Sequence, residues 1–242
     1  MQKVLGYMRK AIEEFDLIQD GDVVGVGVSG GKDSLILLKG LYLLKRFIGI
    51  DYKIIAITLD PQFNGVQGDY SSVQRLCDEM GIEYVLKRTQ IGEIVFNVRK
   101  EEHPCSLCAR MRRGALHDTA KEAGCNKIAL GHHKDDVVET FMMNLEIEGR
   151  IGCFSPKSYL SRKDITMIRP LVLATEKSIR HAVNNCEDIN VVKSKCPADG
   201  HTKRQEMKEY LKEKERNAKG YKDRIFGALR RSGIDGWGFK RQ

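Results

Sequence analysis

Short continuous apolar runs alternate with segments of helical periodicity along most of this chain. The run VVGVGV at 23–28 leads into LILLKGLYLL, and the run KIIAITL at 53–59 leads, after a polar loop, into SSVQRLCDEM. Continuous β-branched runs are typical of strands buried on both faces, whereas apolar residues three and four positions apart indicate helices. The alternation predicts an α/β fold with a mainly parallel sheet and helices on both of its faces.

The same pattern places the remaining elements. It predicts further strands at 51–60, 82–89, 126–133 and 166–173, and a short strand before Cys196. It predicts an N-terminal helix and further helices at 71–81, 105–124, 135–149, 176–187 and 202–220. Polar or glycine residues follow three of the strands: Gly30 and Gly31, Asp60, and Gly131 with His132. Because ligands bind beyond the carboxyl ends of parallel strands, these residues are expected to line one crevice.

A six-residue turn joins the first predicted strand directly to a helix: Ser29, Gly30, Gly31, Lys32, Asp33 and Ser34. Its glycines let backbone N–H groups approach a ligand closely, and the helix N-terminus favours an anion such as phosphate. Lys32 supplies a cation for phosphate oxygens, and Asp33 supplies a ligand for Mg²⁺. Two glycines alone would fit a tight connection equally well, and the spacing is not that of a Walker P-loop. The complete hexapeptide favours the phosphate-binding interpretation and resembles the PP-loop of the ATP-pyrophosphatases.

Charge is distributed unevenly along the chain. Residues 1–192 carry 26 Lys and Arg against 26 Asp and Glu, whereas residues 193–242 carry 15 against 7. This asymmetry predicts a catalytic domain over 1–192 and a basic segment over 193–242 that contacts a polyanion. Its candidate phosphate contacts are Lys203, Arg204, Lys208 and Lys212. A solvated helix is the alternative, because the segment mixes both signs at helical spacing.

The sequence contains no segment that resembles a membrane span or signal peptide. The N-terminal 22 residues lack a continuous apolar stretch, and Lys39, Lys45 and Arg46 interrupt the most apolar later segment. A cytoplasmic protein without membrane contact is therefore expected. Seven cysteines in such a chain indicate reduced thiols, a metal site or catalysis rather than disulfides.

Two of the cysteines form a C-x-x-C pair. Cys105 and Cys108 lie in the first turn of a predicted helix, with Arg112 on the same face. The helix N-terminus and the arginine favour thiolates, and the spacing allows both sulfurs to reach one metal. Half of a zinc site or a redox disulfide would fit the pair as well. Cys196, in a turn at the edge of the basic segment, is the candidate third ligand. Cys77, Cys125 and Cys186 are expected to be structural, whereas Cys153, in a glycine-rich loop, stays open as a further candidate.

Three segments together resemble the tRNA 2-thiocytidine synthases of the PP-loop ATP-pyrophosphatase superfamily: SGGKDS at 29–34, CSLCARMRRGAL at 105–116 with Cys196, and GHHKDDVVETFMMN at 131–144. The resemblance covers roughly residues 5–212 and implies the adenine nucleotide alpha hydrolase-like fold. It implies [4Fe-4S] cluster ligands at Cys105, Cys108 and Cys196. It implies phosphate contacts at the PP-loop and Arg112 and a nucleotide site lined by Gly131, His132, Asp135 and Asp136. Asp60, at a strand end, is a further candidate nucleotide contact, and Lys32, Asp33, Arg112 and Asp136 form the candidate catalytic set. Asp135 and Asp136 can also serve simply as acidic residues at a helix N-terminus.

The resemblance also implies a reaction and its partners. ATP, with Mg²⁺, adenylates the C2 oxygen of a tRNA base, most simply cytidine 32, and sulfide then replaces that oxygen. Three protein thiolates leave one cluster iron open to hold the sulfur. The implied partners are tRNA, a sulfur donor (a cysteine desulfurase or sulfide) and a second copy of the chain in a homodimer.

Three alternatives remain open at the level of sequence. The first is thiolation of a tRNA uridine, although related uridine thiolases carry additional zinc-binding cysteine pairs that this chain lacks. The second is another PP-loop tRNA-modifying ligase, similar to lysidine synthetase, which has no use for three cysteines. The third is a zinc-stabilised nucleic-acid-binding module without catalysis, which leaves SGGKDS unexplained.

Overall fold

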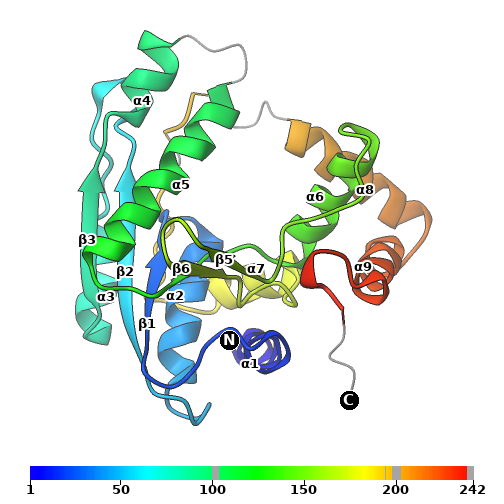
Figure 1. The fold of residues 1–242 in the computed structure, drawn as a ribbon, viewed down its shortest axis with the longest axis horizontal. Helices are drawn as coiled ribbons and strands as arrows, with labels where there is room; N and C mark the ends of the chain where they lie inside the picture. The colour runs from blue at the N-terminus through cyan, green and yellow to red at the C-terminus, as the bar shows by residue number, and fades with distance from the viewer. Residues whose placement is uncertain (100–103, 194, 198–202, 239–242) are drawn as a thin grey trace.

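The computed structural model describes residues 1–99, 104–193, 195–197 and 203–238 (Figure 1). Within these ranges a six-stranded sheet has the order β3-β2-β1-β4-β6-β5. Its strands are β1 (Asp22–Gly27), β2 (Tyr52–Asp60), β3 (Glu83–Arg88), β4 (Lys127–Ala129), β5 (Lys157–Leu160) and β6 (Ile165–Ile168). Every pairing is parallel except that of the edge strand β5 with β6. The predicted α/β class is confirmed.

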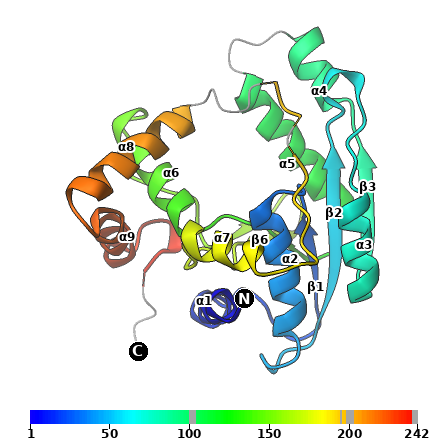
Figure 2. The same ribbon diagram turned by 180° about the vertical axis from the view of Figure 1, so that it is seen from behind.

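Helices cover both faces of the sheet (Figures 1 and 2). One face carries α1 (Gln2–Phe15), α2 (Lys32–Leu44), α3 (Ser71–Met80) and α7 (Glu176–Asn184). The other carries the long helix α5 (Pro104–Glu122). Beside the sheet, α6 (Lys134–Glu146) packs against α8 (Lys203–Asn217) and α9 (Tyr221–Ser232). The described residues also form short helical segments: η1 (Phe63–Gly65), α4 (Ile91–Glu93), η2 (Ile94–Val98) and η3 (Ile234–Gly236).

The glycines of β1 explain how α5 approaches the sheet so closely. Val24 and Val26 are fully buried in the larger core, which α1, α2, α6 and α7 share. Gly25 and Gly27 lie on the opposite face of the strand, because successive residues alternate in direction. A Cβ at Gly25 would come within 3.0 Å of the sulfur of Cys125, and one at Gly27 within 3.2 Å of Leu116. The two faces of β1 are therefore matched to two separate hydrophobic cores.

The C-terminal helices belong to the larger core. Met207 and Leu211 of α8 and Phe226 of α9 are buried there. Trp237, fully buried, packs edge-on against Phe15 of α1 at 5.8 Å between ring centroids and donates from Nε1 to the Phe154 carbonyl over 2.9 Å. Residues 193–242, expected as a basic appendage, thus complete the packing of residues near the start of the chain.

Several predicted boundaries are wrong. The strand expected at 166–173 ends at Ile168, because Pro170 has no N–H for a ladder. The strand expected at 126–133 is confined to Lys127–Ala129. Residues 191–193, part of the short strand expected before Cys196, are irregular. Helix α9 and strand β5 were not anticipated. None of the described helices is both long and apolar enough to cross a membrane.

Candidate active site

The PP-loop forms the predicted turn between β1 and α2. Gly30 has φ of +81°, a conformation that favours glycine. Ser34 donates from Oγ to the Gly31 carbonyl over 2.9 Å and accepts from the Ser29 N–H at 3.2 Å, which fixes the shape of the turn. Gly31 is the N-cap of α2 and provides no side-chain cap. The N-terminus of α2 therefore has no side-chain capping oxygen. Its first N–H groups are available to bind a phosphate.

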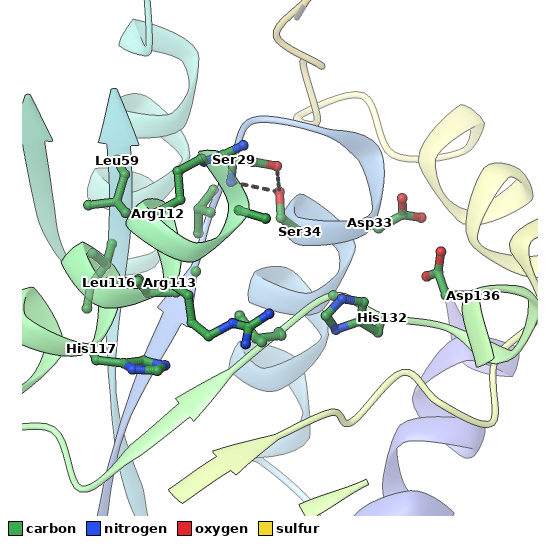
Figure 3. A pocket seen from close by; sticks show the side chains of 16 residues that line it. Ser29, Asp33, Ser34, Leu59, Arg112, Arg113, Leu116, His117, His132 and Asp136 are labelled. Atoms are coloured by element: carbon green, nitrogen blue, oxygen red, sulfur yellow. Dashed lines mark hydrogen bonds between the residues drawn. The ribbon is translucent and has the colours of Figure 1, made fainter. Parts of the chain in front are cut away.

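A cavity of about 440 Å³ opens beyond the carboxyl ends of β1 and β4 (Figure 3). Its apolar lining includes Val28, Ile57, Leu59, Leu116 and Leu130. Its polar lining includes Asp33, Arg112, Arg113, His132 and Asp136. Figure 3 shows the carboxylates of Asp33 and Asp136 on one side, and the side chains of Arg113 and His132 extending toward each other. An apolar part beside cations and carboxylates suits a nucleotide, its phosphates and Mg²⁺.

The expectation of a single crevice needs one correction. Asp60 lies not in this cavity but in an adjoining one of about 230 Å³, which shares Ser29 and Arg112 with the first. Its carboxylate is 2% exposed and accepts hydrogen bonds from the N–H groups of Gln62 (3.1 Å) and Gly68 (2.9 Å). Asp60 therefore shapes the 61–68 loop, and the backbone of that loop already occupies its oxygens.

The loop after β4 brings the second set of predicted residues to the PP-loop. A Cβ at Gly131 would come within 3.1 Å of the Asp33 carbonyl carbon, so glycine permits the close approach. His133 and Asp136 form a reciprocal cap of α6, because the His133 N–H donates to Asp136 Oδ2 over 2.9 Å. The other oxygen of Asp136 binds Arg204 at 3.2 Å. Asp136 thus caps a helix and also lines the cavity, so the two interpretations of this residue are compatible.

His132 is held as a neutral imidazole. Burial, followed by the nearby Arg169 guanidinium, lowers its pKa to about 4. Its ring lies 4.8 Å from that of Phe154, and its Nδ1 is buried without a hydrogen-bond partner among the described residues. At neutral pH the ring can donate or accept one hydrogen bond but carries no charge for phosphate.

Glu176, which sequence reasoning missed, joins the PP-loop to the C-terminal helices. Its Oε1 lies 3.4 Å from Lys32 Nζ, 3.0 Å from Lys208 Nζ and 2.9 Å from Arg180 Nη2. Burial opposes ionisation, but the hydrogen bonds from Lys208 and Arg180 prevail and lower the pKa of Glu176 to about 2. Lys32 Nζ also contacts Asp33 Oδ2 at 2.8 Å. No local sequence signal marks Glu176, because two of its partners, Lys32 of α2 and Lys208 of α8, are distant in the sequence.

Other cations of the basic segment are also paired with carboxylates beside the cavity. Lys222 binds Asp135 at 2.9 Å, and the second oxygen of Asp135 accepts the Glu176 N–H at 2.8 Å. With Arg204 on Asp136 and Lys208 on Glu176, three basic side chains from 193–242 neutralise acidic groups of the rest of the chain. Part of the charge excess therefore has a structural partner inside the molecule.

The predicted cysteine set lies beside the nucleotide cavity. Cys196 lines the adjoining cavity with Arg112, and Cys105 and Cys108 occupy the first turn of α5. Burial raises the pKa of Cys108; Arg112 opposes this shift, whereas Cys196 and Cys105 add to it. The three sulfurs are thus near enough to interact electrostatically. Burial and the other two cysteines thus oppose the thiolate that the helix N-terminus and Arg112 favour at Cys108.

The residues leading to Cys196 are fixed to the PP-loop. The Val192 N–H donates to the Gly30 carbonyl over 2.9 Å, and a Cβ at Gly30 would come within 2.7 Å of Val192 Cβ. Immediately before Cys196, Lys195 donates to the carbonyl of Gln67 over 3.2 Å. Among the described residues, no three or more His, Cys, Asp or Glu side chains are close enough to hold a metal together. By donor type Cys105, Cys108 and Cys196 suit an iron–sulfur cluster, but in this structure their sulfurs are not gathered closely enough to share one ion.

The other four cysteines lie apart from this set. Cys77 and Cys125 are buried in the two hydrophobic cores, and Cys186 is half-buried. Cys153 is buried, donates from its sulfur to the Val137 carbonyl over 3.4 Å, and has a pKa raised to about 12, chiefly by burial. All seven cysteines fall within the described ranges, and none forms a disulfide.

Comparison with known proteins gives concordant matches. A family model described as a PP-loop domain matches residues 6–215. A tRNA-cytidine(32) 2-sulfurtransferase from Ralstonia nicotianae is 40% identical over 225 residues, which cover 91% of this chain and 70% of that protein. One from Pelobacter propionicus is 39% identical, with 91% and 82% covered. Among solved structures, the U34-tRNA thiolase NcsA from Methanococcus maripaludis, with its [4Fe-4S] cluster, superposes with a TM-score of 0.75 at 26% identity, covering 94% of this chain and 77% of that one.

Proposed function

Because this chain belongs to the PP-loop family of tRNA-cytidine(32) 2-sulfurtransferases, we propose that it replaces the C2 oxygen of cytidine 32 in tRNA with sulfur. The reaction consumes ATP and releases AMP and pyrophosphate. The observation that carries the proposal is the position of Ser29 and Arg112, which line both the nucleotide cavity and the adjoining cavity with Cys196. Activation of the base and replacement of its oxygen can therefore occur at one place.

The activation step assigns roles to residues of the PP-loop and α5. The C2 oxygen attacks the α-phosphate, and the bond to the pyrophosphate leaving group breaks. Lys32 and the N-terminus of α2 stabilise the charge that develops on the leaving group, and Arg112 stabilises the α-phosphate. Asp33 and Asp136, on one side of the cavity, would hold Mg²⁺, with Asp136 exchanging its contact with Arg204 for the ion. The loop of Ser29 to Ser34, together with Gly131 and neutral His132, encloses the nucleotide.

The replacement step requires a sulfur nucleophile near the adenylated base. Hydrosulfide adds at C2, and AMP then departs with the original oxygen. Cys105, Cys108 and Cys196 would hold a [4Fe-4S] cluster, which would supply an iron without a protein ligand as a place for the sulfur. The sulfur originates from a cysteine desulfurase or from sulfide.

We also propose different roles for the two segments of the chain. Residues 1–192 carry the nucleotide chemistry, and residues 193–242 add Cys196 and the contacts to tRNA. Arg204 and Lys208 are paired with carboxylates, so we assign the phosphate contacts to the exposed Lys203 and Lys212 of α8. We propose a cytoplasmic location, where both ATP and tRNA are found, and a homodimer as the assembly.

Nucleoside mass spectrometry tests the proposal. tRNA from a strain that lacks this gene should lose 2-thiocytidine, and the wild-type chain, but not its Lys32→Ala variant, should restore it. Loss of a thiolated uridine instead would assign the chain to the reaction named for the NcsA structure. Unchanged thionucleosides would favour a different PP-loop ligase. Anaerobically purified protein should absorb broadly at about 400 nm, as an iron–sulfur protein does. A colourless protein that contains zinc would instead favour the non-catalytic nucleic-acid-binding module.

A further inference from the structure

Lys32 and Lys208, from helices at opposite ends of the chain, bind the same carboxylate oxygen. Glu176 Oε1 lies 3.4 Å from Lys32 Nζ and 3.0 Å from Lys208 Nζ. Lys32 is the lysine of the PP-loop, so its ammonium marks where phosphate oxygens bind. An anion that reaches Lys32 is therefore also within reach of Lys208.

Cations outnumber carboxylates among the groups in direct contact around Glu176. Three cations converge on Glu176, because Arg180 binds the same oxygen at 2.9 Å. Asp33 provides the second negative charge, through Lys32. The surplus of positive charge lies beside the PP-loop, with the side chains of Lys32 and Lys208 still 27% and 32% exposed. A partly exposed cationic surplus of this kind attracts a polyanionic ligand.

The docking of α8 explains how Lys208 stays in place. Met207, next to it, is 5% exposed, and Leu211, one turn later, is fully buried in the larger core. These apolar contacts hold the helix, so Lys208 is free to exchange one anionic partner for another without losing the position of its backbone.

From this arrangement we infer that Lys208 is a second phosphate-binding residue, which contacts the pyrophosphate group together with Lys32. Glu176 is the positioning residue that holds both ammonium groups at one point before the phosphates arrive. The inference rests on the proposed function, because it concerns the leaving group of that reaction. It gives the C-terminal helix a direct part in ATP cleavage, separate from any contact with tRNA.

Binding of magnesium pyrophosphate to the full-length protein, without tRNA or ATP, tests the inference by isothermal titration calorimetry. Lys208→Met should raise the dissociation constant about 10- to 100-fold, the range for loss of one charge-assisted hydrogen bond. Lys208→Arg, which keeps the charge, should recover most of the affinity. Lys214→Met is the matched control: it removes one charge from the exposed face of the same helix, where Lys214 lies 5.1 Å from the Tyr210 ring.

A dissociation constant for Lys208→Met within twofold of the wild type would overturn the inference, as would an effect confined to tRNA affinity. A double-mutant cycle isolates the part played by Glu176. In a Glu176→Gln background the effect of Lys208→Met should shrink, because Lys208 is no longer held beside Lys32; an undiminished effect would overturn that part. If the wild-type protein itself bound no pyrophosphate, this inference would be overturned, whereas the proposed function is judged separately by the thionucleosides of the deletion strain.

Discussion

The backbone N–H of Val192 donates a hydrogen bond to the carbonyl of Gly30 over 2.9 Å. Gly30 belongs to the phosphate-binding turn, and Val192 lies four residues before Cys196 in the chain. The phosphate-binding turn is thus anchored to the part of the chain that precedes a proposed cluster ligand.

Gly30→Ala should disturb both sites at once. An alanine there is strained at φ of +81°, and its Cβ would collide with Val192 at 2.7 Å. We expect the variant to retain less iron per chain than Gly31→Ala, because a Cβ at Gly31 meets nothing closer than Ser29 Oγ at 3.4 Å. Iron content after anaerobic reconstitution measures the difference. Equal iron in the two variants would mean that the Gly30–Val192 contact does not position Cys196.

The ligand set predicts which cysteines matter for the cluster. Alanine at Cys105, Cys108 or Cys196 should remove both the iron and thiolation activity, since each supplies one thiolate. Cys153→Ala should keep its iron, because Cys153 is buried in the core and its sulfur donates to Val137. Iron analysis and absorbance of anaerobic samples decide this. Loss of iron from Cys153→Ala would indicate a fourth protein ligand and remove the open iron from the mechanism.

The PP-loop predicts the products of ATP cleavage. Wild-type protein with tRNA and a sulfur source should form AMP and pyrophosphate, and Lys32→Ala and Asp33→Asn should each slow this reaction by at least about 100-fold, as loss of a transition-state contact does. Lys39→Ala, farther along α2 and paired with Asp188, is the control and should turn over normally. Chromatographic detection of ADP and orthophosphate would rule out the proposed chemistry.

Glu139 predicts a pH dependence of stability. Its carboxyl is 3% exposed on α6, and burial, followed by repulsion from Asp136, raises its pKa to about 7. The folded state holds this proton more tightly than the unfolded state, so Glu139 costs stability progressively as pH rises from about 4.5 to 7. Glu139→Gln should abolish this decrease in the free energy of unfolding, which amounts to at most about 3 kcal/mol. Urea unfolding at a series of pH values measures the free energy of unfolding, with Glu146→Gln, at an exposed position, as control. Parallel stability curves for wild type and Glu139→Gln would contradict the prediction.

The exposed lysines of α8 predict a salt-dependent affinity for tRNA. Lys203→Ala and Lys212→Ala should each remove one phosphate contact and so flatten the slope of log affinity against log salt by roughly 0.7 to 0.9. Lys10→Ala, exposed on α1, should leave the slope unchanged. Filter binding over a range of salt concentrations provides the slopes. Wild-type slopes in both α8 variants would favour a solvated helix without tRNA contacts.

Local chemistry was predictable from the sequence, and long-range pairing was not. SGGKDS and the C-x-x-C pair are recognisable because their residues are neighbours in the chain. Glu176 and Lys208 matter because they contact each other and, through Glu176, Lys32. These residues are far apart in the sequence, and a single sequence gives no signal for such long-range contacts. Arg112 and Arg113 both line the cavity, but no sequence motif distinguishes Arg113 as a site residue.

The boundaries that failed have physical causes as well. The strand β5 is a half-exposed edge strand with the sequence KSYL, which lacks the continuous apolar run of the central strands. Helix α9 carries only a weak signal in the sequence, since Phe226 and Leu229 are three positions apart among many charged residues. Its burial depends on α6, which the sequence of α9 alone does not reveal.

The packing of Trp237 against Phe15 has a consequence for the synthesis of the chain. Trp237 is synthesised about 220 residues after Phe15, so at roughly 5–20 residues per second the helix α1 waits for roughly 10 to 40 s before its aromatic partner is made. Arg204, Lys208 and Lys222, which pair with carboxylates beside the nucleotide cavity, are made in the last part of that interval. A nascent chain therefore acquires its closed core and these site cations almost together, and a ribosome stalled before residue 204 would release neither.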